Sequence, residues 1–291
     1  MRISATFWVI ILMAALQGCG DQRYVAILTV EVDSSGGRES HKIHSWAELA
    51  MYQDAADIVV IDALRTARDD DLIYLKPFSQ LEELWLYNAP ITDAGLEHLA
   101  GLSKLKRLDL RRTAISDAAF VHVAKLTNLE ELLLSFTPVT GSELVQLKGL
   151  SNLKKLYLDH THVVDAHLTS LQNLPHLEDI YLHHTAITDA GLSYLEGLAN
   201  LQTLDLHDTE LTDEGIVHLV RLSQLKELHL SGTKITNKGL AALAPLPSLE
   251  KLVLYRTYPQ IKRAGQEEFE SRRRKLAGTS GDWPSVTISR S

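Results

Sequence analysis

The sequence has little of several features on which small stapled proteins and enzymes depend. It contains one cysteine, Cys19, so an internal disulfide framework is excluded. It contains no P-loop, no Gly-x-Ser-x-Gly elbow and no His-Glu-x-x-His motif. The formal net charge of -8 gives no general attraction to a phosphate backbone. We therefore expect no enzyme, no cofactor and no nucleic-acid partner.

The chain has one long apolar run, Phe7–Leu16, close to its amino terminus. Arg2 precedes the run, which is too short to span a bilayer comfortably and has the form of a signal peptide. The tetrapeptide LQGC follows and ends at Cys19, and it resembles the bacterial lipobox. The resemblance implies lipidation of Cys19 and a lipid-anchored protein of the bacterial cell envelope, at the outer membrane or facing the periplasm. Plain secretion and retention as an uncleaved anchor are the alternatives.

Leucine recurs at a fixed spacing of 24 residues through most of the chain. The positions are Leu81, Leu105, Leu129, Leu153, Leu177, Leu201, Leu225 and Leu249. Around them the chain follows the template LxxLxLxxTxITDxGLxxLxxL, most clearly in residues 177–198. In-register copies at a single spacing predict a repeat array.

Each part of the repeat predicts a local structure. Leu204 and Leu206 are two residues apart and so point to one side of a short strand, which leaves Asp205 and His207 on the other side. The threonine after the strand carries a hydroxyl that can bond backbone groups inside the turn. Thr188-Asp189 then precedes an apolar triplet, as at the start of an N-capped helix. We therefore expect a strand, a turn and a short helix in every unit.

These motifs resemble the leucine-rich-repeat family, in the form with threonine where many members have asparagine. The resemblance covers residues 81–257 most strongly. It implies an α/β solenoid with a curved parallel β-sheet on the concave face and short helices on the convex face. Family members are mostly ligand- or protein-binding scaffolds, which implies that role here without naming a ligand.

The chain divides into four predicted segments. They are a signal peptide (1–18), an N-terminal cap (19–56), the repeats (57–258) and a C-terminal cap (259–291). Within the caps we expect strands at 24–32 and 286–288 and helices at 46–53 and 260–276. An array needs such covers because its end units would otherwise expose apolar surface.

Charged doublets precede the strands and alternate in sign from one unit to the next. They are Glu82-Glu83, Lys106-Arg107, Glu130-Glu131, Lys154-Lys155 and Glu178-Asp179. In-register stacking places opposite charges side by side. We interpret them as a ladder of weak ion pairs that also favours solubility.

The outward side of the strands carries aromatic, histidine and arginine residues that the template does not need for folding. This composition resembles an interface hot spot. The candidate ligand-binding residues are Trp85, Tyr87, Arg111, Arg112, Phe136, Tyr157, Asp159, Tyr181, His183, Asp205, His207 and His229. We expect a non-enzymatic extracytoplasmic scaffold whose concave face binds a protein or an envelope glycan. A structural or assembly factor of an envelope complex is the alternative.

Five of the 13 histidines fall on this face, namely His160, His183, His184, His207 and His229. Because His183 and His207 take equivalent places on adjacent strands, near Asp159 and Asp205, a metal-responsive site for an ion such as zinc is one interpretation. A pH-responsive interface is another, since adjacent histidines would gain charge together at about pH 6. The close ligand spacing of known metal motifs is missing, so we expect interface residues and no metal ligands.

Overall fold

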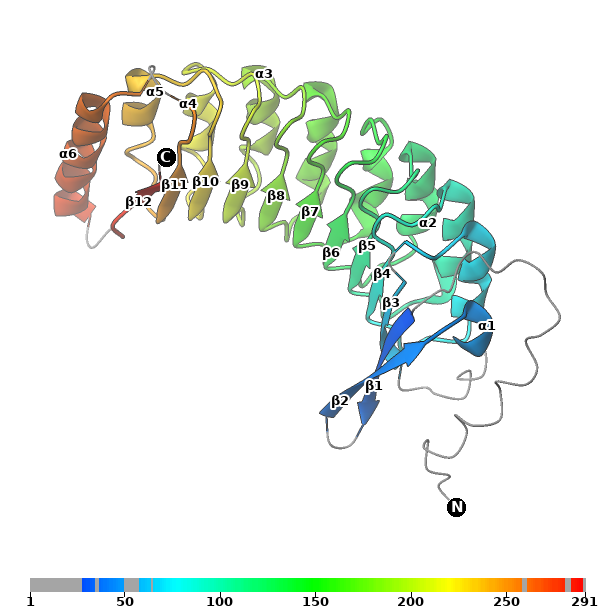
Figure 1. Ribbon diagram of the computed structural model, residues 1–291. Helices are drawn as coiled ribbons and strands as arrows, with labels where there is room; N and C mark the ends of the chain where they lie inside the picture. Colours follow the sequence, from blue (N-terminus) through cyan, green and yellow to red (C-terminus); the bar gives the residue numbers. More distant parts are fainter. Residues whose placement is uncertain are drawn as a thin grey trace.

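The computed structural model describes residues 28–34, 37–49, 58–63, 65–257, 261–280 and 284–289. Within them the chain forms an arc, with a 12-stranded sheet along the concave side and short helices along the convex side (Figure 1). The strand order is β12-β11-β10-β9-β8-β7-β6-β5-β4-β3-β1-β2. The predicted α/β solenoid is thus confirmed, whereas the predicted signal peptide and Cys19 lie outside the described residues.

The strands from β3 to β12 are parallel and in register. They are β3 (Ile58–Asp62), β4 (Glu83–Trp85), β5 (Arg107–Asp109), β6 (Glu131–Leu133), β7 (Lys155–Tyr157), β8 (Asp179–Tyr181), β9 (Thr203–Asp205), β10 (Glu227–His229), β11 (Lys251–Val253) and β12 (Thr287–Ser289). Between repeats, each residue pairs with its equivalent 24 positions away, as Leu108 does with Leu132. Each template position therefore forms one column across the sheet.

The second half of each unit forms a short helical segment on the convex side (Figure 1). The α-helices are α1 (Trp46–Leu49), α2 (Phe120–Val123), α3 (Asp189–Leu192), α4 (Ile216–Leu219), α5 (Asn237–Ala242) and α6 (Arg263–Ser280). The 3-10 helices are η4 (Asp69–Leu75), η5 (Asp93–Gly101), η6 (Asp117–Ala119), η7 (Leu144–Gly149), η8 (Asp165–Asn173) and η9 (Ser193–Leu195). Helices need more room than strands, which stack at about 4.8 Å, so the sheet takes the inside of the curve.

The core is one continuous apolar layer between the sheet and the helices. Leu204 and Leu206 are both fully buried, as their spacing predicted. The recurring threonine closes the turn after each strand, because its hydroxyl donates to the carbonyl three residues earlier. These threonines are Thr113, Thr137, Thr161, Thr185, Thr209, Thr233 and Thr257, at 2.5–2.8 Å. The predicted role of this hydroxyl is confirmed.

A second ladder, which the sequence analysis did not predict, joins the starts of the helical segments. In this Asp–Thr ladder each aspartate accepts at least two hydrogen bonds from the next unit, from a threonine or, for Asp93, from Ser116. Asp189 accepts from the Thr212 backbone N–H at 2.9 Å and from its hydroxyl at 2.6 Å. The ladder aspartates are Asp69, Asp93, Asp117, Asp165, Asp189 and Asp213.

The Asp–Thr ladder also explains a recurring glycine. A Cβ on Gly215 would lie 2.4 Å from Oδ1 of Asp189, far inside van der Waals contact. A Cβ on Gly191 or on Gly239 would clash in the same way with the ladder aspartate of the preceding unit, Asp165 or Asp213 respectively. The ladder is interrupted once, where Gly141 replaces the aspartate and Val164 has no side-chain cap. A single missing rung is therefore compatible with the fold.

An antiparallel hairpin, β1 (Leu28–Ser34) and β2 (Gly37–Ile43), extends the sheet beyond β3. A strand was expected at 24–32, but β2 was not predicted. Its sequence, GRESHKI, is mostly polar and carries no apolar alternation to mark a strand. Strand β2 forms because its backbone pairs with β1, and this pairing is not visible in its side-chain pattern.

Helix α6 lies against the last repeat and closes the carboxy-terminal end (Figure 1). Phe269 is fully buried there. The Arg273 guanidinium donates to the carbonyl oxygens of Leu246 at 2.6 Å and of Leu249 at 3.2 Å, and so satisfies backbone acceptors at the end of the array. Strand β12 pairs with β11, as the apolar pattern at 286–288 predicted.

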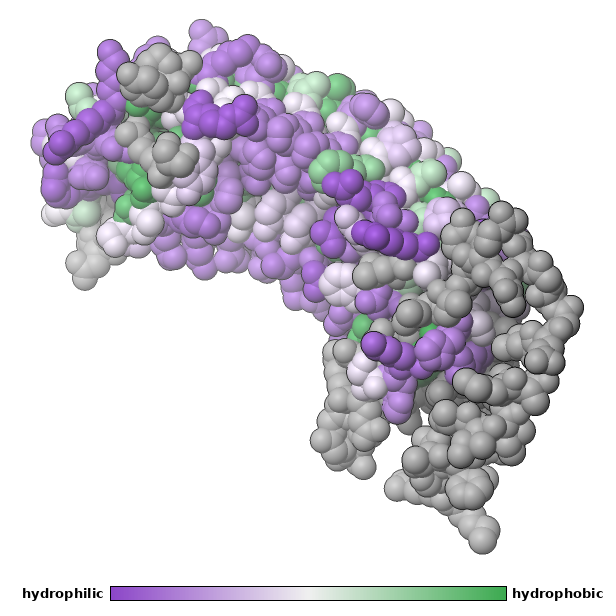
Figure 2. Space-filling model, in the orientation of Figure 1, coloured by the Kyte–Doolittle hydropathy of each residue, from purple (hydrophilic) through white to green (hydrophobic). Residues whose placement is uncertain are grey.

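The surface shown in Figure 2 is largely hydrophilic, with small and separate apolar areas. In the described part of the chain, no helix combines the length and the apolarity needed to cross a bilayer.

Candidate functional site

The concave side of the sheet is organised in four columns, one for each outward template position. In the unit that begins at Leu81 these positions are Glu83, Trp85, Tyr87 and Asn88, in that order. The first column contains the second residue of each charged doublet. Arg107 pairs with Glu131 at 2.8 Å, and Lys155 pairs with Asp179 at 2.8 Å. The residues just ahead of the strands pair likewise, as Lys154 does with Glu130 at 2.7 Å. The predicted ladder of alternating ion pairs is confirmed.

The fourth column consists of the residue at which the chain turns away from the sheet, and its members have φ between 52° and 63°. They are Arg65, Asn88, Arg112, Phe136, His160, His184, Asp208 and Arg256, and they include all the described non-glycine residues with positive φ. This left-handed conformation is unfavourable for L residues unless the surrounding structure imposes it. The repeat therefore fixes this turn whatever side chain occupies it.

Arginine side chains lie over aromatic rings in the amino-terminal half of the face. Arg107 lies 4.4 Å above the Trp85 ring, and Arg111 lies 5.4 Å from the Tyr87 ring. The Arg111 guanidinium also holds the fully buried carboxylate of Asp109, with Nε 2.9 Å from Oδ1. Each of these two arginines is thus held in place by an aromatic ring and by an ion pair with a carboxylate.

Two tyrosines form the centre of the face. The rings of Tyr157 and Tyr181 are stacked, with centroids 4.2 Å apart and planes 5° apart. Burial raises the pKa of both hydroxyls above the ordinary tyrosine value, so both stay protonated. They present apolar faces together with hydrogen-bonding tips.

A continuous stack runs along the fourth column. The Arg112 guanidinium lies 4.1 Å above the Phe136 ring, Phe136 stacks on His160 at 3.9 Å, and His160 stacks on His184 at 4.2 Å. Burial, followed by the charges of the neighbouring histidines, lowers the pKa of His160. His160 is therefore less readily charged than an ordinary histidine, which weakens the idea that all five histidines gain charge together.

An Asp–His cluster occupies the later units, where His183 lies between two carboxylates. Its Nε2 is 3.3 Å from Asp159 Oδ2, and its Nδ1 is 3.3 Å from Asp205 Oδ2. Asp205 also accepts from His207 Nδ1 at 2.7 Å, and His229 Nδ1 lies 3.7 Å from it. These histidines lie on the outward face, as predicted, but only part of each side chain is exposed, 19% for His183 and 28% for His207. The carboxylates beneath them are buried.

The Asp205 carboxylate is held in its charged form. Burial works to raise its pKa, but the close approach of the His183 ring, the hydrogen bond from the His207 backbone N–H and the charges of both imidazoles outweigh burial and lower the pKa to about 2. Asp205 is therefore an anion beneath the histidines throughout the physiological range.

A shallow hollow of about 400 Å³ lies in the middle of the face. Its lining residues are Tyr87, Arg111, Arg112, Ser135, Phe136, Tyr157, Asp159, Tyr181, His183 and Asp205. Ser135 is the lining residue that was not predicted, because a small polar side chain carries no distinctive signal. Of the other predicted residues, Trp85 lines a neighbouring hollow. His207 and His229 do not line the first hollow themselves but lie next to Asp205, which does.

Comparisons with known proteins agree with this geometry. Two leucine-rich-repeat family models match the chain, over residues 151–211 and 222–244. Among solved structures, internalin C2 from Listeria monocytogenes str. 4b F2365 is similar, with a TM-score of 0.58 and 28% sequence identity. The match covers 73% of this chain and 84% of that one. No curated protein matches the chain in sequence.

Proposed function

The chain is a leucine-rich-repeat protein, and we propose that its concave face recognises one protein partner without catalysing a reaction on it. The leucine-rich-repeat fold is a protein-binding scaffold. Its curved sheet presents equivalent positions of successive units side by side, so binding side chains can change without disturbing the core. The proposal places the partner over the hollow and the stacked rings around it.

The observation that carries the proposal is the concentration of stacked rings and guanidinium groups where the repeat has no need of them. The position of Tyr157 and Tyr181 is filled by Leu133 and Val253 in other units, and the position of Phe136 by Asn88. The fold therefore accepts smaller side chains at these places. Tyrosine and arginine are enriched in interface hot spots, and rings already held by stacking lose little conformational freedom on binding.

The proposal extends to cell location through the amino-terminal pattern. The apolar run and the tetrapeptide ending at Cys19 support a lipoprotein anchored in the bacterial cell envelope. Lipidation of Cys19 predicts a mature membrane-extracted chain that begins at this residue and carries the mass of its acyl groups. Intact-mass spectrometry measures both, and a chain beginning elsewhere without added mass contradicts the anchor.

Site-specific photocrosslinking tests the binding face. A photoreactive residue at Phe136, which is 41% exposed, is expected to crosslink the partner in intact cells. The matched control position is Val217, which is 56% exposed and lies on the convex helix α4. Equal crosslinking from both positions, or crosslinking from Val217 alone, contradicts the proposal.

Substitutions taken from the protein's own repeats then measure the contribution of the face to binding of the crosslinked partner. Tyr181→Val and Phe136→Asn each introduce a residue that another unit carries at the same template position. Each is expected to weaken binding by about 2 kcal/mol, or roughly 30-fold, with little change in stability. Val217→Asn is the control and should leave affinity unchanged. If the ligand is an envelope glycan, the product crosslinked at Phe136 would contain glycan. If the protein is a constitutive part of a larger envelope complex, the product would contain subunits of that complex.

A further inference from the structure

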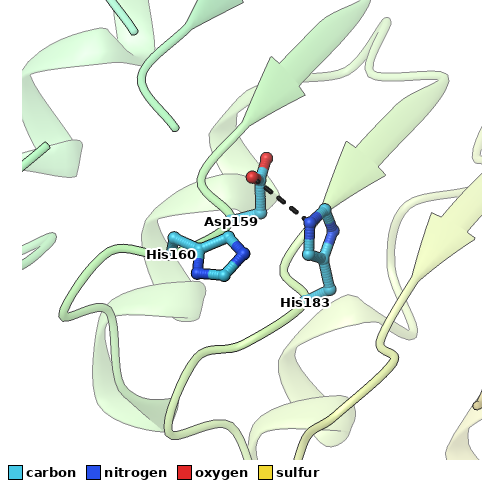
Figure 3. A group of neighbouring side chains, drawn as sticks. All are labelled: Asp159, His160 and His183. Atoms are coloured by element: carbon cyan, nitrogen blue, oxygen red, sulfur yellow. Dashed lines mark ion pairs between the residues drawn. The ribbon is translucent and has the colours of Figure 1, made fainter. Parts of the chain in front are cut away.

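Asp159, His160 and His183 gather around one space on the concave face (Figure 3). Asp159 follows strand β7, His160 is the turn residue after it, and His183 follows the adjacent strand β8. One potential ligand atom from each lies within 4.8 Å of the others. We propose that these three side chains bind a divalent transition-metal ion, for which Zn²⁺ has the most suitable chemistry.

The ligand types and their separation fit tetrahedral zinc. Two imidazole nitrogens and one carboxylate oxygen are donors that zinc takes in sites with an open fourth position. Bonds of about 2.0–2.1 Å place tetrahedral ligands about 3.3 Å apart. His183 Nε2 and Asp159 Oδ2 are 3.3 Å apart. This pair therefore needs little movement to bind an ion.

Each ligand is held in place by a neighbour that does not bind the ion. The Ser135 hydroxyl donates to Asp159 Oδ1 at 2.5 Å. The buried Nδ1 of His183 has no partner in hydrogen-bond geometry in the described structure, and it faces Asp205 Oδ2 at 3.3 Å. An ion on Nε2 would leave the ring proton on Nδ1, directed at this carboxylate. Such carboxylate–histidine–metal arrangements orient the ring and raise its affinity for the ion.

The third ligand is fixed by stacking. The His160 ring lies between Phe136, at 3.9 Å, and His184, at 4.2 Å. It meets His183 nearly at right angles, with planes 87° apart. Because a nitrogen lone pair lies in the plane of its ring, two perpendicular rings can direct lone pairs toward one point.

The neighbouring group of His183, Asp205 and His207 fits an ion less well, although its ligand atoms are also close. The rings of His183 and His207 are stacked at 4.0 Å with planes only 16° apart, so their lone pairs lie in separate, nearly parallel planes and are poorly placed to converge on one ion. His207 Nδ1 is also already 2.7 Å from Asp205 Oδ1, shorter than a tetrahedral edge. We therefore assign Asp205 and His207 to the surroundings of the site rather than to its ligands.

Sequence spacing did not predict this site because its ligands come from different repeats. His160 and His183 are 23 residues apart, and only in-register stacking of β7 and β8 brings them together. Asp159 and His183 also line the hollow. The fourth position is thus available to water or, where the proposed function holds, to a partner side chain.

Metal titration of the untagged, chelator-stripped full chain tests the proposal without a partner protein, so its failure is distinct from failure of the proposed function. Isothermal titration calorimetry with Zn²⁺ is expected to give one ion per chain. Co²⁺ is expected to give the intense visible absorption of a four-coordinate ion. Absence of saturable binding would overturn the proposal.

Substitutions drawn from other repeats locate the ion. His183→Ser and His160→Asn copy Ser135 and Asn88, which occupy the same columns, and each is expected to lower Zn²⁺ affinity more than 100-fold. Asp205→Asn, which removes the carboxylate that faces Nδ1 of His183 but none of the three ligands, is expected to lower affinity about 10–100-fold while retaining one ion and the Co²⁺ spectrum. The exposed histidine His176 provides the control, since His176→Ala should bind normally.

His207→Ser distinguishes the two neighbouring groups and should change affinity less than tenfold. Strong loss in His207→Ser together with normal binding in His160→Asn would overturn the assignment. Should a variant fail to fold, histidine modification of the intact chain by diethyl pyrocarbonate gives the same information. Zn²⁺ should protect His160 and His183 and leave His176 reactive, whereas equal modification with and without Zn²⁺ contradicts the site.

Discussion

The Asp–Thr ladder and the Asp–His cluster both contain carboxylates from different repeats, but they use them differently. In the ladder, each aspartate binds a backbone N–H and a hydroxyl of the next unit, and the same pair recurs in most units. In the cluster, Asp159 and Asp205 face histidine side chains that other units lack. A carboxylate bound to backbone holds units together. A carboxylate bound to variable side chains is available for another role.

The largest effect is expected on the ladder side of this comparison. Asp189→Ala leaves the N–H and the hydroxyl of Thr212 without their acceptor. Hydrogen bonds to a charged group contribute about 1.5–3 kcal/mol each, so the free energy of unfolding should fall by about 3 kcal/mol. Urea unfolding followed by circular dichroism measures the change.

The control for this variant is Glu210→Ala, at an exposed side chain that pairs with Lys234. It should change stability by less than about 0.5 kcal/mol. A loss in Asp189→Ala no greater than in this control would remove the structural side of the comparison, and would agree with the tolerance of the natural gap at Gly141.

A smaller and pH-dependent effect is expected in the cluster. The folded-state pKa of Asp205 is about 2, below the ordinary aspartate value of 3.8. Charged Asp205 therefore stabilises the fold fully above about pH 4, and this contribution is lost as the pH falls toward 2. The difference corresponds to about 2 kcal/mol. Asp205→Asn should be less stable than the original protein by this order at pH 7.

Chemical denaturation of both proteins between pH 7 and pH 2 measures this difference. The two stabilities should converge as the pH falls through the window from about 4 to about 2. Parallel curves over the whole range would show that the pKa of Asp205 is not depressed, and the cluster would then resemble an ordinary polar surface.

The smallest effect is expected in the first column, where the basic partner of the Lys155–Asp179 ion pair is exposed to solvent although Asp179 is largely buried. Lys155→Gln removes the ion pair with Asp179, and the Lys155 side chain is 43% exposed. Stability should change by less than about 1 kcal/mol, and added salt should reduce even that difference. Thermal melts at low and high salt measure it. A loss that matches Asp189→Ala would mean that the charged columns, too, hold the units together.

Much of the fold was predictable because the repeat carries redundant signals. Leucine spacing, the turn threonine and the alternating doublets all predicted an in-register parallel sheet, and each has its expected contact in the structure. Strand β2 was not predictable, because its polar sequence carries no pattern and backbone pairing alone supports it. The Asp–Thr ladder was not predicted, because capping of the helix within one unit already explained the Thr188-Asp189 pair. Nothing in the sequence indicated that these residues also bond to neighbouring units.

The candidate site was predictable as a set of residues but not as an arrangement. The period alone placed Tyr157, Tyr181 and His183 on the outward face, since alternation along a strand follows from backbone geometry. The period could not show that His183 lies between two buried carboxylates, or that His160 meets it edge to face. Those relations depend on side-chain torsions and on contacts between residues 22–24 positions apart. Sequence therefore determined which side chains share the concave face, and tertiary packing decided which of them are stacked, buried and held together as potential ligands.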